Sequence, residues 1–189
     1  IGGGTTEVAV VSLGGVVESE SIKTAGDAFD EAIVRYVRRK HNILIGKRTA
    51  EELKIGIACL VPRAEVGIQE VKGRCLTTGL PKSVKISSVE LVEAIAEPAR
   101  DILETIHMVL ERTPPELVSD VAQNGIVMAG GGSLIYGFDQ LVEKDTGIRT
   151  TVVDDALSCA AFGSGKMLMN LNDMPEGMVN LARKRQMKA

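Results

Sequence analysis

Aromatic side chains are scarce in this chain of 189 residues: tryptophan is absent, and aromatic residues make up only 3% of the sequence. Cysteine and histidine are also rare, with three and two residues respectively. The cysteines are odd in number and far apart, so neither a disulfide framework nor a CxxC metal clip is expected, and a reducing cytoplasm is favoured. Because His41 and His107 have no cysteine or carboxylate cluster beside them in the sequence, no zinc site is expected.

Long hydrophobic runs and an excess of one charge are lacking as well. No stretch approaches the roughly 20 apolar residues that cross a bilayer, and no signal peptide is visible. The 22 Lys and Arg nearly balance the 25 Asp and Glu, which argues against nucleic acid as a partner. With 44% hydrophobic residues, the chain can bury one core. Because loop chemistry occupies its first residues, we expect a piece of a longer protein.

Hydrophobic periodicity predicts strands and helices in alternation. Residues 6–12 and 16–22 are typical of a β-hairpin around Gly14-Gly15. Apolar residues at three- and four-residue spacing predict a helix at 28–40. The later elements predicted are a helix at 49–59, weak strands at 65–74 and 76–86, a long helix at 89–112, a short helix starting at 114–115, a buried strand at 126–129, a helix at 137–144, a strand at 149–153 and a last helix at 157–171.

Two capping boxes are predicted, in which a Ser or Thr and a Glu three residues later satisfy the first backbone N–H groups of a helix. One pairs Thr49 with Glu52, and the other pairs Ser87 with Glu90. Pro98 lies inside the long helix. Because proline donates no backbone hydrogen bond, it should bend or divide that helix.

The order of these elements predicts an α/β fold, in which helices flank a mixed sheet and a small α+β lobe is inserted. We expect the core at 1–41 and 88–172, the lobe at 42–87 and a C-terminal tail at 173–189. Apolar residues at 76–84 are expected to form the lobe's own core rather than a contact surface, since scattered apolar residues are poor evidence of an interface.

Two glycine-rich loops are the most informative feature. Gly2-Gly3-Gly4-Thr5-Thr6 precedes an apolar strand, and its glycines would let backbone amides approach a polyphosphate while the threonine hydroxyls add donors. The alternative is an ordinary hairpin turn, because the motif lacks the Walker lysine and the G-x-G-x-x-G pattern. Residues 130–134 follow a predicted strand, where glycines permit close contact with a flat base or ribose and a nearby helix would supply free amides.

Glu51 and Lys54 lie three residues apart on the helix predicted at 49–59, so their side chains share one face. In the presence of two glycine-rich loops they are candidate ligand contacts. By themselves they would be an ordinary solvated ion pair.

These motifs carry a family resemblance. In order and spacing, residues 1–10, Glu51-x-x-Lys54 and residues 129–134 resemble the second phosphate loop, the ribose/adenine helix and the adenosine loop of the superfamily of actin, DnaK-type chaperones and sugar kinases. The similarity is greatest to the MreB family of bacterial actin-like proteins. It runs from Ile1 to about Leu171 and includes residues 25–30 and 48–51.

The resemblance implies an actin-like ATPase (RNase H-like) domain and an ATP site between two domains. Magnesium would sit at the phosphates, with no direct ligand from this chain. The phosphate-binding residues implied are Gly2, Gly3, Gly4, Thr5 and Thr6. The ribose- and adenine-binding residues implied are Gly26, Asp27, Glu51, Lys54, Gly130, Gly131, Gly132, Ser133 and Leu134.

The resemblance also implies what this chain does not supply. The aspartate that commonly precedes Ile-Gly-Gly-Gly, the first phosphate loop and the acidic residue that activates water belong outside residues 1–189. No catalytic residue is therefore expected here, and the chain alone should be a poor ATPase although the complete protein would be one. The membrane-binding surface of the family also belongs to the other half.

The leading functional hypothesis is a part of an ATP-binding, filament-forming protein that organises cell-wall synthesis and maintains rod shape. It would bind copies of itself and cell-wall elongation proteins at the inner face of the cytoplasmic membrane. The alternatives are a sugar kinase, which would need a sugar pocket upstream, and a DnaK-like chaperone, which would continue into a β-rich peptide-binding domain. A third is a partner-binding module without hydrolysis.

Overall fold

The structure, a computed structural model, describes residues 1–169. The predicted tail at 173–189 and the end of the last predicted helix lie outside this range. In chain order the elements are β1 (Thr6–Ser12), β2 (Gly15–Ile22), α1 (Gly26–His41), β3 (Ile43–Leu44), α2 (Lys47–Ile57), β4 (Ile68–Cys75), β5 (Pro81–Ser87), α3 (Ser88–Arg112), α4 (Pro115–Asn124), β6 (Ile126–Met128), η1 (Gly131–Leu134), α5 (Phe138–Thr146), β7 (Thr150–Val152) and α6 (Cys159–Met169).

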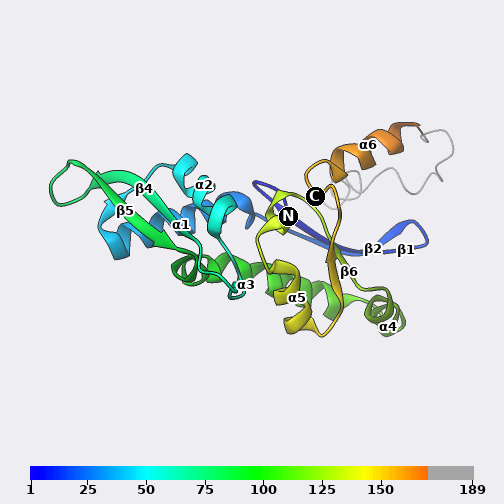
Figure 1. The fold of residues 1–189 in the computed structure, drawn as a ribbon. Coiled ribbons are helices and arrows are strands. Elements are labelled where there is room, and N and C mark those ends of the chain that lie inside the picture. The colour runs from blue at the N-terminus through cyan, green and yellow to red at the C-terminus, as the bar shows by residue number, and fades with distance from the viewer. Residues whose placement is uncertain (170–189) are drawn as a thin grey trace, which may run out of the picture.

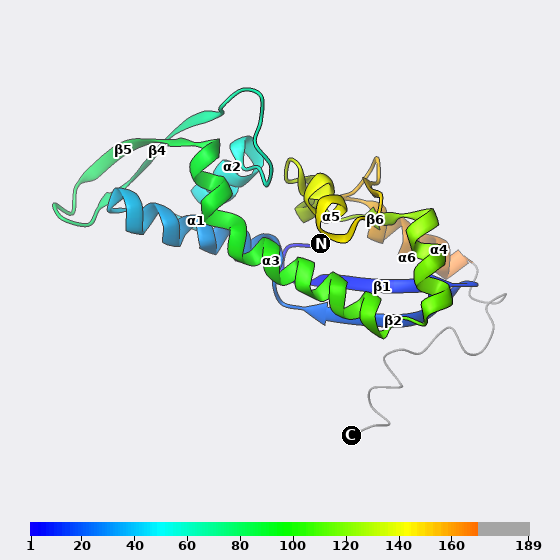
Figure 2. The same cartoon turned by 90° about the horizontal axis from the view of Figure 1, so that it is seen from below.

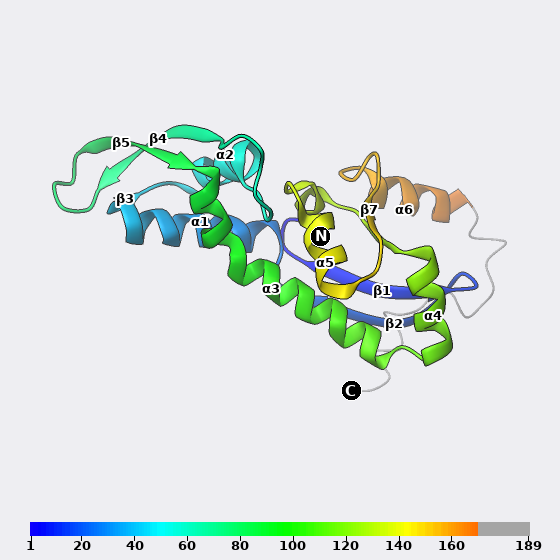
Figure 3. The same ribbon diagram turned by 60° about the horizontal axis from the view of Figure 1, so that its bottom comes forward.

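The described strands form three small sheets. β1 and β2 pair as an antiparallel hairpin, and β3, β4 and β5 form an antiparallel sheet in that order. β6 and β7 pair in parallel. Parallel and antiparallel pairing therefore both occur, and the chain is α/β as the sequence predicts. The sequence did not predict the two-residue strand β3, which lies beside α1 (Figure 3).

The long helix α3 connects the two ends of the molecule. Figure 1 shows α2, β4 and β5 at one end and the β1–β2 hairpin with α4 at the other. α3 packs against α1, α2 and β5 on the first side, and against β1 and β2 on the second. The helix is continuous through Pro98, and Figure 2 shows its axis changing direction along its length. The proline therefore does not divide the helix. No helix within residues 1–169 is both long and apolar enough to cross a membrane.

One hydrophobic core runs through both ends. Leu53, Val71 and Ile86 belong to it on the side of the inserted lobe, and Phe29 and Phe138 belong to it in the middle. The two phenylalanine rings meet edge to face, with centroids 6.1 Å apart and planes at 85°, and this geometry adds to the free energy gained by burial. The core thereby ties α1 to α5.

The start of α2 differs from the prediction, whereas the start of α3 agrees with it. Ser87 and Glu90 form the predicted capping box. Thr49 and Glu52 do not, because α2 begins at Lys47 after Gly46, whose carbonyl accepts the N–H of Ala50 at 3.1 Å. Thr49 consequently lies inside the first turn, and no side chain caps this helix.

Two burial expectations were wrong in part. Val127, in the middle of the strand predicted to be buried, is 66% exposed. In the inserted lobe, Leu76 and Leu80 are 40% and 65% exposed, and only Val84 packs partly against the core. The lobe's core is formed instead by side chains of β3, α2 and the inward positions of β4 and β5.

Because Ser87 caps a helix and Thr49 does not, the same substitution at the two positions should change the free energy of unfolding by different amounts. Ser87→Ala removes a side chain that bonds two groups at the start of α3, so the free energy of unfolding should fall by about 1 kcal/mol. Thr49→Ala should change it by less than about 0.5 kcal/mol, because alanine suits the interior of a helix. Urea denaturation of the two variants measures both values. An equal loss in both would contradict the boundary of α2.

Candidate functional site

The first glycine-rich loop forms a tight turn before β1. The N–H of Gly2 donates to the carbonyl of Thr5 at 2.9 Å, which leaves Gly3 and Gly4 at the tip of the turn. Both glycines are exposed, and a side chain at either would have no atom within 4 Å of its Cβ. One side of the loop is therefore open to a ligand.

Hydrogen bonds to α1 decide which way the peptide groups of this loop point. The carbonyl of Gly2 accepts the N–H of Gly26 at 3.0 Å, and the carbonyl of Gly3 accepts the N–H of Asp27 at 2.7 Å. In a trans peptide the N–H points opposite to the carbonyl of the same plane. The N–H groups of Gly3 and Gly4 consequently point away from α1, on the open side, where they can donate to an anion.

The two threonines of the loop differ in their surroundings. Thr5 is exposed. Thr6 is 1% exposed, and its hydroxyl donates to the carbonyl of Thr24 at 2.7 Å. The hydroxyl of Thr6 therefore holds β1 to the end of β2, and the expectation that it adds a donor for a ligand was wrong.

Lys54 reaches from α2 to the same place. Its ammonium lies 2.8 Å from Oδ1 of Asp30 and donates to the carbonyl of Gly26 at 3.1 Å. The side chains of Lys54 and Asp30 are only 13% and 3% exposed. Among the described ion pairs, Lys54 thus pairs with Asp30 of α1 rather than with Glu51, whose side chain is exposed.

Burial changes the pKa of Asp30 in this pair. Loss of hydration raises the pKa of Asp30, and the nearby Lys54 ammonium opposes this shift. Asp30 lies on the buried face of α1 between Phe29 and Ile33, which are both fully buried. The sequence analysis missed Asp30, although an acidic residue on the apolar face of an amphipathic helix was the signal for it.

A second ion pair joins the same two helices at the surface. Nζ of Lys47 lies 2.9 Å from Oδ1 of Asp27, and its hydrogen bond to that carboxylate lowers the pKa of Asp27. The Asp27 side chain is therefore turned towards α2. Both pairs hold the inserted lobe against the first turn of α1.

The second glycine-rich loop packs against the first. The backbone nitrogen of Ile1 donates to the carbonyl of Ala129 at 2.7 Å, and the N–H of Gly132 donates to the carbonyl of Ile1 at 3.0 Å. Gly130 has a φ of 86°, and a Cβ there would overlap the carbonyl oxygen of Ile1. Only glycine fits this approach.

The amides of the second loop are mostly engaged within the chain. The N–H of Gly130 donates to Ala156 at 2.8 Å, and the N–H of Ser133 donates to the carbonyl of Gly130 at 3.1 Å, which also accepts the Ser133 hydroxyl at 2.7 Å. The N–H groups at these positions are therefore not available to a ligand. What the loop offers a ligand is its glycine backbone surface and the side chain of Leu134, which is 55% exposed.

The segment after α2 contacts the end of the second loop. The N–H of Leu60 donates to the carbonyl of Tyr136 at 2.9 Å, and the guanidinium of Arg63 stacks over the Tyr136 ring, 4.5 Å from its centroid. α2 is thus tied to α1 by its lysines and to the second loop by the residues that follow it. The fold brings together both loops, Gly26, Asp27 and Lys54, and Glu51 lies at the exposed edge of α2.

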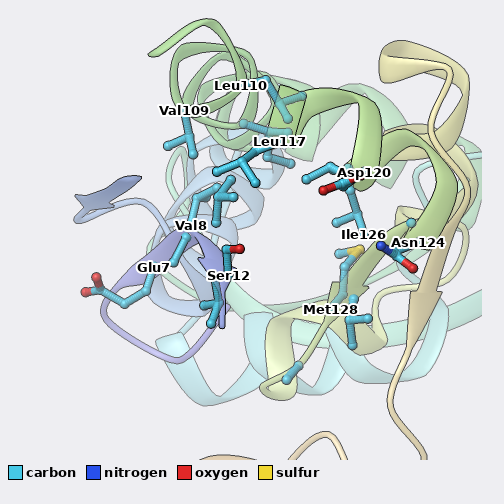
Figure 4. A pocket seen from close by; sticks show the side chains of 18 of the residues that line it. Glu7, Val8, Ser12, Val109, Leu110, Leu117, Asp120, Asn124, Ile126 and Met128 are labelled. Carbon is cyan, nitrogen blue, oxygen red and sulfur yellow. The ribbon is translucent and has the colours of Figure 1, made fainter. Parts of the chain in front are cut away.

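A cavity of about 570 Å³ lies between β1, α3, α4 and β6, and Ile1, Thr6 and Ala129 line its end beside the loops. Its walls are mostly apolar, with Val8, Leu117, Ile126 and Met128 among the side chains shown in Figure 4. The carboxylate of Glu7 points away from it in this view. An apolar cavity does not suit phosphate, so the candidate site for a charged ligand lies at the loops.

Comparison with known proteins identifies relatives of this chain. The family model for MreB/Mbl proteins matches residues 1–176. The cell shape-determining protein Mbl of Bacillus subtilis is 42% identical over 176 residues, which are 93% of this chain and 53% of Mbl. The cell shape-determining protein MreB of Escherichia coli is 48% identical over 168 residues, which are 89% of this chain and 48% of MreB. The chain spans about half the length of these relatives.

Solved structures show the same fold. MreB5 of Spiroplasma citri bound to ADP aligns with a TM-score of 0.88 at 38% identity, covering 90% of this chain and 52% of that one. A MamK double helical filament aligns with a TM-score of 0.68 at 28% identity, covering 85% of this chain and 52% of that one. These alignments confirm the predicted actin-like fold.

The buried pair predicts a specific pattern of stability. Lys54→Met leaves the Asp30 carboxylate buried without a counter-charge, so the free energy of unfolding should fall by about 3 kcal/mol or more. Because the folded protein holds a proton on Asp30 at higher pH than the unfolded chain does, this loss should shrink as the pH falls. The double variant Asp30→Asn/Lys54→Met should recover most of the stability. Thermal melts between pH 5 and pH 8 test the pattern, and a pH-independent loss would contradict it.

Proposed function

Because the chain belongs to the MreB/Mbl family, we propose that it is the nucleotide-binding half of an ATP-binding, filament-forming bacterial actin homologue. The observation that carries the proposal is the first loop, which directs the N–H groups of Gly3 and Gly4 to its open side. The solved MreB5 structures with ADP and with AMPPNP support an adenine nucleotide as the ligand.

The proposed site uses the two loops and α2. Gly2, Gly3, Gly4 and Thr5 would contact the β- and γ-phosphates, with Thr6 supporting the loop from behind. Gly26, Asp27, Glu51 and Lys54 would lie beside the ribose and adenine, together with 130–134. Preorganised N–H groups stabilise phosphate charge without further rearrangement. Magnesium would bind through the phosphates.

Catalysis would need the other half of the protein. We propose no catalytic residue in this chain, which spans about half the length of its relatives. The core at 1–41 and 88–172 would carry nucleotide, and the lobe at 42–87 would contact it through Glu51 and Lys54. Hydrolysis by the complete protein would then act as the switch for filament turnover.

Self-association is the second part of the proposal. It is supported by the likeness to a MamK filament. The relatives named as cell shape-determining proteins support a role in rod shape. The filaments would lie at the inner face of the cytoplasmic membrane and bind cell-wall elongation proteins. Among the relatives reported above, none is a sugar kinase or a chaperone.

Gly3 offers a clean test of the nucleotide site. A Cβ at this position would have no atom within 4 Å outside its chain neighbours, so Gly3→Leu should leave the melting temperature nearly unchanged while it obstructs a phosphate. We expect the affinity of the complete protein for Mg-ATP to fall at least tenfold by calorimetry, which corresponds to about 1.4 kcal/mol.

Gly163→Leu is the matched control, because Gly163 lies in α6 with equally open surroundings. Its affinity should match that of the unmodified protein. Gly131→Leu tests the second loop, although its Cβ would press on the Leu157 side chain at 3.0 Å. Unaltered affinity in both loop variants would refute the site.

Filament formation is tested by sedimentation of the complete protein with and without Mg-ATP, followed by electron microscopy of the pellet. Nucleotide-dependent filaments are expected, because the relatives with this fold include a filament. A protein that binds ATP and stays in the supernatant at all concentrations would favour the kinase or chaperone alternative.

A further inference from the structure

Asp30 is a charged residue of α1 that does not face solvent. The residue is 2% exposed and lies between two fully buried side chains, Phe29 and Ile33. A buried carboxylate is unfavourable unless a counter-charge or hydrogen bonds compensate for the lost hydration. The compensating group is the ammonium of Lys54 at 2.8 Å, which arrives from a different part of the chain.

A short series of contacts connects this pair to the first loop. The Lys54 ammonium donates to the carbonyl of Gly26 at 3.1 Å. The N–H of the same residue, Gly26, donates to the carbonyl of Gly2 at 3.0 Å. The carboxylate therefore holds a lysine by charge at the point where the loop is attached to α1, and the two following links are hydrogen bonds.

The ammonium also keeps capacity for a ligand. A lysine side chain carries three N–H groups and no acceptor. The Gly26 carbonyl accepts one of them at 3.1 Å. Oδ1 of Asp30 lies 2.8 Å from the nitrogen as an ion pair without hydrogen-bond geometry, so at least one N–H remains. Because 13% of the side chain is exposed, this N–H can meet a ligand at the loops while Gly26 and Asp30 hold the ammonium in place.

Removing the charge of Asp30 would release the lysine. Glu51 lies three residues before Lys54 on α2, at a spacing that allows an ion pair at the helix surface, and it is close enough to influence the pKa of Asp30. Without the buried carboxylate, the ammonium gains hydration and a partner by turning outward to Glu51. Asp30 would thus select the observed orientation of Lys54 over one turned towards Glu51.

We propose that Asp30 is a positioning residue for nucleotide binding, which holds the Lys54 ammonium at the start of α1 so that its remaining N–H faces the nucleotide. The inference rests on the function proposed above. It adds a requirement that the resemblance did not supply: the lysine acts only when the buried aspartate holds it.

The test compares three forms of the complete protein: unmodified, Asp30→Asn, and Asp30→Asn/Lys54→Met. Loss of one charge-assisted hydrogen bond should weaken Mg-ATP binding about tenfold in Asp30→Asn, measured by calorimetry below the melting temperature. If Asp30 acts through Lys54, the double variant should bind ATP as weakly as Asp30→Asn, within about twofold, because the released lysine no longer contributes. A role confined to stability would not produce this equality.

Asp145→Asn is the matched control, because Asp145 pairs with His107 at 2.7 Å on the surface, away from the loops. Its affinity for ATP should equal that of the unmodified protein. Asp30→Glu, which keeps the charge, should restore part of the affinity that Asp30→Asn loses.

Two results would overturn the inference. ATP affinity in Asp30→Asn equal to that of the unmodified protein would overturn the inference. So would a double variant that binds several-fold more weakly than Asp30→Asn, because Lys54 would then contribute without Asp30. If the unmodified protein binds no ATP, the proposed function fails first and this inference fails with it.

Discussion

The buried ion pair between Lys54 and Asp30 is the contact on which the arrangement of the candidate site depends. It joins α2 of the inserted lobe to α1, and through Gly26 it connects both to the first loop. A buried charge needs its partner at close range, so the pair admits little variation in how the lobe sits on α1. The exposed pair between Lys47 and Asp27 repeats the connection at the surface, where an ion pair contributes much less.

The hydrophobic core packs around this polar contact. α3 packs along both ends of the molecule, and the rings of Phe29 and Phe138 hold α1 to α5. The two loops meet at Ile1, where Gly130 and Gly132 allow the backbone to approach closely. Precise placement of ligand-binding groups is achieved when they lie on elements that are themselves well packed, and here α1 and α2 provide those elements.

Local chemistry explains which elements were predicted well. The hairpin and the Ser87 capping box both depend on residues close in the sequence, so a short window contains the information that forms them. Thr49 and Glu52 have the spacing of a capping box, but the helix begins earlier, at Lys47 after Gly46. Thr6 was predicted as a ligand donor, yet its hydroxyl donates to the carbonyl of Thr24, in the segment that follows β2.

The sequence by itself determined the α/β class, most of the helices and strands, the two glycine-rich loops and the family. The class, the elements and the loops follow from periodicity and turn chemistry, which are local properties of the chain, and the family follows from the resemblance of the motifs. Only the tertiary structure decided that Lys54 pairs with Asp30 rather than Glu51, that the loop carbonyls face α1, and that the amides of the second loop are engaged within the fold. These depend on contacts between residues far apart in the chain, where burial sets the cost of leaving a polar group unpaired.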